Sequence, residues 1–270
     1  MGQEKEHLQE MSFWGHLDVL RGVLFKAVIL LVALTAILFI FMPQIFDNFI
    51  LAPTRANFIT YQLFQKLSVD SVLPQQSAGS DFNIELINIK LASQFFIHIS
   101  SSLWMAVVVA FPFIIYLMWS FISPGLYSHE KRGAKRGFLF GCTMFYLGAA
   151  TGYLLVFPIT LRFLASYQLS SLVPNVISLD SYMDNFIMIC LMMGILFELP
   201  LLAWLFGKMG FITRNFFSKY RRHAIVVLLI LAAIVTPTGD PFTLAIVFFP
   251  IYFLWELSSF IVPKAKKENN

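Results

Sequence analysis

The stretch Gly22-Val-Leu-Phe-Lys-Ala-Val-Ile-Leu-Leu-Val-Ala-Leu-Thr-Ala-Ile-Leu-Phe-Ile-Phe-Met42 decides the class of fold to which this chain belongs. Lys26 is its one charged side chain, and Pro43 follows it. A helix needs about 20 mostly apolar residues to cross about 30 Å of hydrocarbon. This stretch therefore predicts a membrane-spanning helix that ends near Pro43.

The rest of the chain has the same character. Of its 270 residues, 58% are hydrophobic and only 13% are charged, whereas soluble globular proteins carry about 25% charged residues. This composition excludes a soluble enzyme, a disordered regulator and a nucleic-acid-binding protein. The two cysteines, Cys142 and Cys190, lie inside apolar runs, which argues against a disulfide framework or a metal site.

Five further apolar runs follow the first, so we expect an all-α polytopic membrane protein with six transmembrane helices. We predict the spans at residues 22–42, 95–122, 138–161, 186–206, 222–237 and 242–262 of a single membrane domain, 1–270. Outside them lie an amphipathic segment, a long loop and a tail, at residues 1–21, 43–94 and 263–270.

The fifth run is the shortest, with about a dozen apolar residues before Thr236-Pro237. Even a helix from Tyr220 to Pro237 reaches only about 26 Å at 1.5 Å per residue. We expect short fifth and sixth spans, around which the bilayer thins locally. The alternative is a re-entrant pair that never crosses.

The distribution of basic residues predicts the orientation. Fourteen of the 19 Lys and Arg residues fall on one side of the spans, Lys26 lies within the first span, and Arg55, Lys66, Lys90 and Arg162 fall on the other side. Lys and Arg are enriched in cytoplasmic segments. We therefore expect both termini in the cytoplasm, which requires an even number of spans, and a periplasmic loop at 43–94.

Two segments outside the spans show helical spacing. Apolar residues recur at 3.6-residue intervals in the leading segment, at Phe13, Trp14, Leu17, Leu20 and Leu24. This spacing predicts an amphipathic helix along the membrane interface that turns into the first span; an ordinary lead-in without function is the alternative. In the long loop, residues 57–69 and 84–99 predict two short helices.

The sequence offers no catalytic constellation. It lacks G-x-S-x-G, H-E-x-x-H, G-x-x-x-x-G-K-[ST] and G-x-G-x-x-G motifs. Its histidines are scattered, with no carboxylate or cysteine at ligand spacing; they are His7, His16, His98, His129 and His223. We therefore expect neither enzymatic activity nor a metal or other cofactor.

Glu198, in Gly194-Ile-Leu-Phe-Glu-Leu-Pro200, lies in the middle of the fourth predicted span. A charged side chain at the bilayer centre costs about 2.5–3.5 kcal/mol on insertion scales. Pro200 also has no backbone N–H, so the carbonyl of Leu196 lacks its helical hydrogen bond. Together they predict a polar pocket inside the bundle. The alternative is a protonated Glu198 that hydrogen-bonds a neighbouring helix.

Two other carboxylates lie toward the cytoplasmic ends of predicted spans. Glu256 lies nearer the cytoplasmic end of the last span, where a snorkelling role competes with a functional one. Glu130 follows the second span and adjoins Lys131 and Arg132. On physical grounds alone, it is a solvated surface charge paired with those neighbours.

The string Phe121-Ile-x-Pro-x-Leu-Tyr-x-x-Glu130 resembles the first cytoplasmic loop of proteins of the TatC family. These proteins are the largest subunit of the twin-arginine protein translocase. Other landmarks of that family occur in matching order along nearly the whole chain. They are His16-Leu-x-x-Leu-Arg21, Ala52-Pro53, Phe157-Pro158, Phe197-Glu-x-Pro200, Thr236-Pro237, Asp240 and Glu256. Pro53, Pro124 and Pro237 are expected to form structural turns.

The resemblance implies a receptor for signal peptides that carry two consecutive arginines, in a complex that exports folded proteins with the proton-motive force. It places the arginine site at Glu130 and Phe121, with help from the leading segment, here His16, Leu20 and Arg21. It also implies a bacterial-type inner membrane, self-association, and single-span partners of the TatA and TatB types. Their intramembrane polar contacts are expected at Glu198, Pro200, Asp240 and Glu256.

Two positions depart from the family pattern. The family usually has a glutamate just before the Leu-Arg pair of the leading segment, where this chain has Val19, and a glutamine where it has Leu244. A rival class of function is a proton-coupled small-molecule transporter that uses Glu198. Such transporters usually carry internal repeats and paired broken helices, and this sequence shows no repeat.

Overall fold

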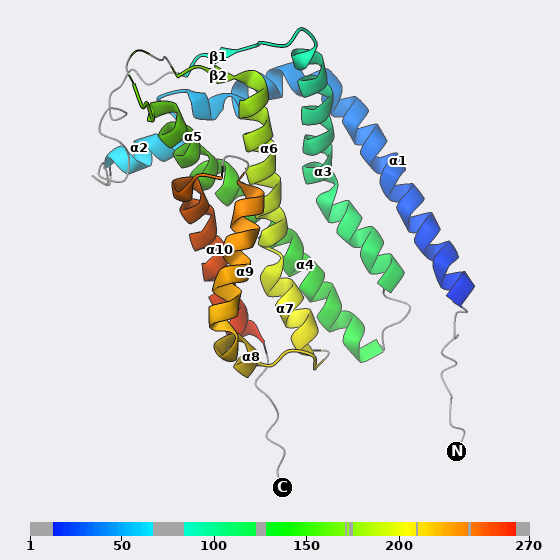
Figure 1. Ribbon diagram of the computed structural model, residues 1–270. Helices are drawn as coiled ribbons and strands as arrows, with labels where there is room; N and C mark the ends of the chain where they lie inside the picture. The colour runs from blue at the N-terminus through cyan, green and yellow to red at the C-terminus, as the bar shows by residue number, and fades with distance from the viewer. Residues whose placement is uncertain are drawn as a thin grey trace, which may run out of the picture.

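The computed structural model describes residues 13–66, 84–122, 128–170, 172, 175–208, 210–236 and 239–262. Figure 1 shows a bundle of long helices, with the start of α1 and the end of α10 at one end, here called the terminal end. The opposite end, called the loop end, carries α2 and two short strands. The helices and strands are α1 (Phe13–Ile45), η1 (Phe46–Ile50), η2 (Ala52–Thr54), α2 (Ile59–Lys66), β1 (Leu86–Ile87), α3 (Ser93–Ile122), α4 (Ser128–Thr151), η6 (Gly152–Val156), α5 (Phe157–Ser166), β2 (Ile177–Ser178), α6 (Leu179–Leu196), α7 (Leu199–Lys208), α8 (Arg214–Lys219), α9 (Arg221–Val235) and α10 (Pro241–Ile261).

Five helical stretches of the described chain are long and apolar enough to cross a membrane. They are Leu17–Phe64, Ser93–Phe121, Gly137–Ser166, Leu179–Lys208 and Pro241–Ile261. A multi-span, nearly all-helical membrane protein is therefore confirmed. The helix at the fifth predicted span, α9, has 15 residues and reaches about 22 Å at 1.5 Å per residue. A sixth crossing stays a prediction.

The expectation of a short sixth span was wrong, because α10 has 21 residues and reaches about 31 Å. Pro250 lies inside this helix without ending it. At its start, the Asp240 side chain accepts a hydrogen bond from the backbone N–H of Thr243 at 2.7 Å, and Pro241 occupies the first turn. Both features favour a helix that begins at this point.

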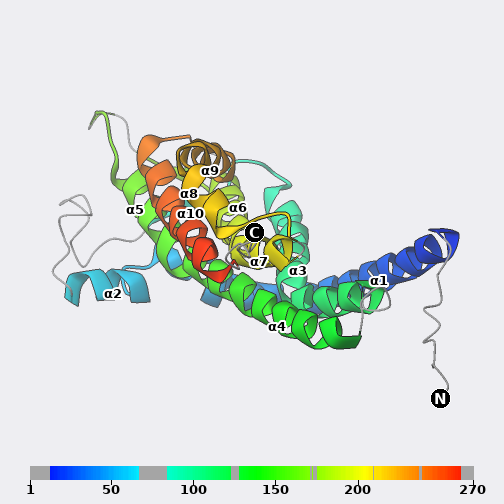
Figure 2. The same ribbon diagram turned by 90° about the horizontal axis from the view of Figure 1, so that it is seen from below.

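The first helix also differs from its prediction. The leading segment does not turn at the interface, because α1 is continuous from Phe13 to Ile45 and contains Pro43. A π-helical turn, η1, then extends it to Ile50. Helix α1 packs chiefly against α3 and diverges from it toward the terminal end (Figures 1 and 2).

The loop end contains one of the two predicted helices. Helix α2 lies within the predicted range 57–69, but residues 84–92 are not helical and α3 begins at Ser93. Leu86 and Ile87 instead pair in parallel with Ile177 and Ser178. In this segment Ile84 and Leu86 are half-buried, whereas Glu85 and Ile87 are exposed, the period-two alternation of a strand. The fold is therefore not purely α.

A close approach of α4 and the following η6 to α6 lies at the centre of the bundle. A Cβ atom on Gly148 would lie 2.5 Å from the carbonyl oxygen of Met193, and one on Gly152 would lie 3.0 Å from the Cα of Cys190. Small residues spaced four apart allow two membrane helices to approach in this way. The spacing of Gly148 and Gly152 is visible in the sequence, but the close approach was not predicted from it.

Candidate functional site

The structure brings three elements that carry predicted signal-peptide residues to the terminal end. Phe121 is the second-last residue of α3, and its side chain is half-buried. Glu130 lies in the first turn of α4, where a helix N-terminus stabilises negative charge. The side chain of Glu130 and the whole of Pro124 lie outside the described residues.

The third of these elements is the start of α1. Leu20 is 42% exposed, and Arg21 is exposed beside it. The side chain of His16 lies outside the described part. Helix α1 diverges from α3 at this end (Figures 1 and 2).

Glu198 lies at a break in the fourth long helical stretch. Helix α6 ends at Leu196 and α7 begins at Leu199, so the helix is interrupted at Glu198 and the residue before it. Helical hydrogen bonding resumes with the backbone N–H of Leu202, which donates to the carbonyl of Glu198 at 3.0 Å. Pro200, in the first turn of α7, is buried. Pro200 has no N–H for the carbonyl of Leu196, and its ring clashes with that carbonyl, which accounts for the break.

The Glu198 carboxylate faces α4. An ideal Cβ on Gly141 would lie 3.0 Å from Glu198 Oε2 and 2.6 Å from a methyl carbon of Leu201, so the missing side chain of Gly141 makes room for both. Glu198 Oε1 is buried and has no hydrogen-bond partner among the described residues. An unsatisfied buried carboxylate oxygen is costly in a membrane, so this group is the strongest candidate for a functional polar contact inside the bundle.

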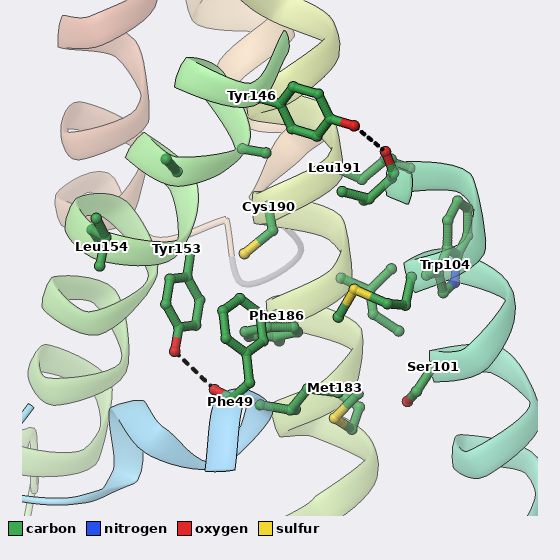
Figure 3. Close-up of a pocket in the computed structure, with 16 residues that line it drawn as sticks. Phe49, Ser101, Trp104, Tyr146, Tyr153, Leu154, Met183, Phe186, Cys190 and Leu191 are labelled. Carbon is green, nitrogen blue, oxygen red and sulfur yellow. Dashed lines mark hydrogen bonds between the residues drawn. The ribbon is translucent and has the colours of Figure 1, made fainter. Parts of the chain in front are cut away.

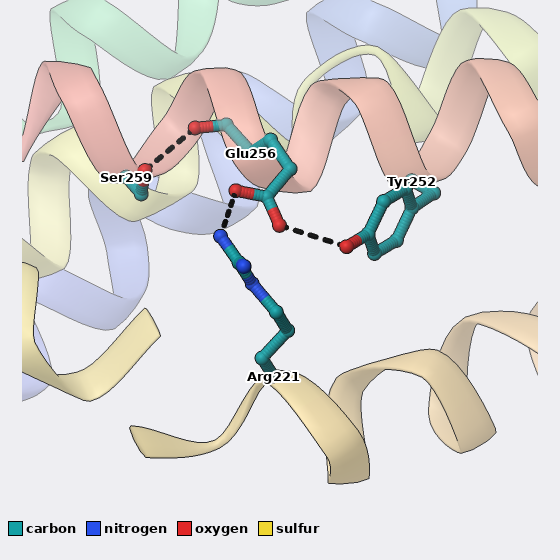
Figure 4. Close-up of polar contacts among 4 residues, drawn as sticks. All are labelled: Arg221, Tyr252, Glu256 and Ser259. Atoms are coloured by element: carbon teal, nitrogen blue, oxygen red, sulfur yellow. Dashed lines mark hydrogen bonds and ion pairs between the residues drawn. The ribbon is translucent and has the colours of Figure 1, made fainter. Parts of the chain in front are cut away.

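Glu256 is fully paired within the chain, as Figure 4 shows. Arg221 Nη2 donates to its Oε2 at 2.7 Å, and the Tyr252 hydroxyl donates to its Oε1 at 2.9 Å. The Glu256 side chain is 25% exposed and that of Arg221 is 55% exposed. This pair joins the first residue of α9 to α10 at the terminal end. In the sequence, Arg221 counted only among the basic residues that predict the orientation.

The predicted structural turns are partly described. Pro53 is buried in η2, and its carbonyl oxygen lies 3.0 Å from the Tyr61 hydroxyl oxygen. Asp240 caps α10 as described above, and Gly239 before it has a φ of 61°, a conformation that favours glycine. Pro237 lies outside the described residues.

A buried arginine at the loop end was missed. The Arg162 side chain is 2% exposed, and its guanidinium carbon lies 4.7 Å from the centroid of the Tyr61 ring, a cation–π contact. It therefore connects α5 to α2. In the sequence, Arg162 counted only as a basic residue on the sparsely charged side, and nothing in its spacing signalled burial. Across the described ranges, no group of His, Cys, Asp and Glu residues could hold a metal ion.

The sequence profile of the family described as "Sec-independent protein translocase protein (TatC)" matches residues 15–250. The chain belongs to the TatC family. It is similar to the TatC protein of Blattabacterium sp. subsp. Periplaneta americana, with 34% identity over 97% of this chain and 100% of the relative. It is also similar to the TatC protein of Koribacter versatilis, with 31% identity over 98% of this chain and 91% of the relative.

Solved structures of TatC proteins share the fold. A crystal structure of the twin-arginine translocase receptor TatC in DDM matches with a TM-score of 0.70 and 29% identity, over 92% of this chain and 99% of the other. A second crystal structure of a twin-arginine translocase receptor TatC gives 0.66 and 29%, over 91% and 97%. The resemblance seen in the sequence is confirmed. This chain is a multi-span component of a protein translocase. Its family is a transport family rather than a classical enzyme family.

Proposed function

We propose that this protein is the signal-peptide receptor and core subunit of a twin-arginine translocase, which exports folded proteins with the proton-motive force. The observation that carries the proposal is the family match over residues 15–250. The two solved relatives are twin-arginine translocase receptors. The site of recognition is the terminal end, where Phe121, Glu130 and Arg21 belong to three neighbouring elements.

The orientation belongs to this proposal. With both termini in the cytoplasm of a bacterial inner membrane, the terminal end faces the compartment in which precursors are made, and the loop end faces the periplasm. The basic residues support this orientation. It requires that α9 cross the bilayer as a sixth span, and its length of about 22 Å requires local thinning.

The chemistry of the arginine pair explains why a carboxylate at this end is decisive. A guanidinium group is permanently charged and presents a planar fork of donors, which a carboxylate accepts in a bidentate manner. Glu130 lies in the first turn of α4, where a helix N-terminus favours a negative charge. Phe121, less than a helical turn before the end of α3, offers an apolar surface to the hydrophobic part of the same peptide.

Photocrosslinking from position 121 tests this function. With a photoreactive amino acid in place of Phe121, a labelled signal peptide with two arginines is expected to crosslink efficiently. A peptide with two lysines keeps the charge but loses the forked donors, so its yield is expected to fall about tenfold, the effect of about 1.4 kcal/mol. A peptide with one lysine and one arginine should fall between them. Equal yields from all three peptides would overturn the proposal.

Single-span TatA- and TatB-type subunits are the proposed partners inside the membrane, together with further copies of this chain. Glu198 is their proposed polar contact, because its Oε1 is unsatisfied among the described residues. Rotation of the side chain away from α4 would present the carboxyl group to a polar residue of a partner. Pro200, Asp240 and Glu256 complete the proposed set, although Glu256 reaches a partner only if its bonds to Arg221 and Tyr252 are exchanged.

Replacing Glu198 by Ala is expected to reduce co-purification of the single-span partners about tenfold, while signal-peptide crosslinking at Phe121 persists. The reason is that a hydrogen bond to a charged group contributes about 1.5–3 kcal/mol. The measurement is the amount of partner recovered with the tagged chain from solubilised membranes. Leu202→Ala is the matched control, because Leu202 lies on α7 and is 44% exposed. Unchanged recovery with Glu198→Ala would remove Glu198 from the partner contact.

A further inference from the structure

An apolar pocket of about 420 Å³ lies between α3, α4, η6 and α6, with η1 at its loop end (Figure 3). Its polar wall atoms are largely paired within the chain. The Tyr146 hydroxyl donates to the carbonyl of Val108 at 3.1 Å, and the Tyr153 hydroxyl donates to that of Phe49 at 2.9 Å. The pocket therefore offers mainly hydrocarbon and aromatic surface to an occupant.

Ser101 is the exception among the residues that line the pocket. Its side chain is 3% exposed, and its Oγ has no hydrogen-bond partner in the described part of the chain. The neighbouring serines behave differently: Ser100 and Ser102 donate to carbonyls of their own helix, at 3.2 and 2.7 Å. Figure 3 shows the Ser101 hydroxyl on the pocket side of α3. A buried hydroxyl without a partner favours an occupant that carries an acceptor.

The pocket continues toward an apolar groove whose edge carries two exposed amide residues. It shares Phe49 and Met105 with this more open groove of about 430 Å³, which Gln44 and Asn48 also line. Both amides lie where α1 ends and η1 begins. A ligand in the pocket would therefore have its apolar part among the helices and its polar part near these amides.

The dimensions of the pocket limit what can enter. Between Met183 and Leu191, which both line it, α6 rises about 12 Å at 1.5 Å per residue. Over this length, a volume of about 420 Å³ accommodates a thin, flexible chain.

We propose that this pocket binds one acyl chain of a bilayer phospholipid from the leaflet at the loop end. The chain runs along α6 toward Leu191, and the Ser101 hydroxyl donates to the carbonyl oxygen of its ester. The headgroup lies beside Gln44 and Asn48. In a membrane, the medium that reaches a lateral apolar opening is lipid rather than water, so no other apolar ligand has to be supplied.

Lipid photocrosslinking tests this proposal on the full chain in nanodiscs. The probe is a phosphatidylcholine with a diazirine in the middle of one acyl chain, and crosslinked peptides are mapped by mass spectrometry. We expect crosslinks to the pocket-facing residues of α6 between Met183 and Leu191. Ala150→Phe, which places a ring at the pocket wall, should reduce them about tenfold. Leu147→Phe is the matched control and should leave them unchanged, because Leu147 is 49% exposed on the same helix outside the pocket lining.

Ser101→Ala is the second variant, because it removes the hydroxyl without changing the packing. It should lower the same crosslinks severalfold, so it decides the matter even if Ala150→Phe does not fold. Crosslinks that are confined to the outward faces of the helices, or that survive both variants, would overturn the proposal.

Discussion

Replacing Glu130 by Gln is expected to weaken binding of a twin-arginine signal peptide by about 30-fold to several thousand-fold. Removing one partner of a desolvated, hydrogen-bonded charge pair costs about 2–5 kcal/mol, and each 1.4 kcal/mol is tenfold in affinity. Glutamine keeps the size of the side chain and one carbonyl acceptor. It loses the second acceptor oxygen and the charge, both of which a guanidinium fork requires.

The measurement is a fluorescence anisotropy titration of labelled peptide into the purified chain in nanodiscs. Glu85→Gln is the matched control, because Glu85 is an exposed glutamate at the loop end, beside β1, and its replacement should leave the affinity unchanged. Raising the salt concentration should weaken wild-type binding more than binding to Glu130→Gln, since the charge pair is screened. If Glu130→Gln binds with wild-type affinity, Glu130 is not part of the arginine site, whatever the role of Phe121.

The existence of the long helices could be predicted because hydrocarbon imposes a single requirement on them. Every backbone group in a bilayer must be satisfied within the protein, so an apolar run of sufficient length is a helix. Their ends were less predictable. Pro43 was expected to end the first span, but α1 continues to Ile45 and η1 to Ile50. Pro43 leaves the carbonyl of Phe39 without a backbone donor, and His98 Nε2 of α3 lies 2.8 Å from that oxygen instead.

The loop end was the least predictable part of the fold. Ile84, Leu86 and Ile89 match a helical pattern as well as a strand pattern when the segment is read alone. The choice depends on residues 177–178, about ninety positions away, which supply the partner strand. Local spacing carries no information about such a partner.

The candidate site was predictable where a charge lies in an apolar run and unpredictable where two segments meet. Glu198 was recognisable because the insertion cost of a carboxylate is a property of its own segment. The Arg221–Glu256 pair joins residues 35 positions apart, so neither residue could reveal the other in advance. Gly141, which makes room for the Glu198 carboxylate, acquires its role only from the packing of α4 against α6 and α7.

The second large effect is expected when Gly148 in α4 is replaced by Ala. The new Cβ would lie 2.5 Å from the Met193 carbonyl oxygen and 2.6 Å from the Cβ of Phe197. Because the nearest obstacle is backbone, it cannot rotate away, and α4 must separate from α6. Overpacking of this kind costs about 1–3 kcal/mol, which corresponds to a melting temperature lower by about 2–12 °C in a chain of this size. Since α6 leads into α7, the same shift displaces Glu198.

Gly22→Ala is the matched control, because a Cβ on Gly22 of α1 would meet no atom within 4 Å. Alanine is a better helix former than glycine by about 1 kcal/mol, so this variant should be as stable as the wild type or slightly more stable. The measurement is the fraction of the purified chain that stays monodisperse in detergent after heating, followed as a function of temperature. Equal thermal stability of the two variants would show that α4 and α6 are not in close contact at Gly148, and the proposed position of Glu198 against α4 would then lose its structural basis.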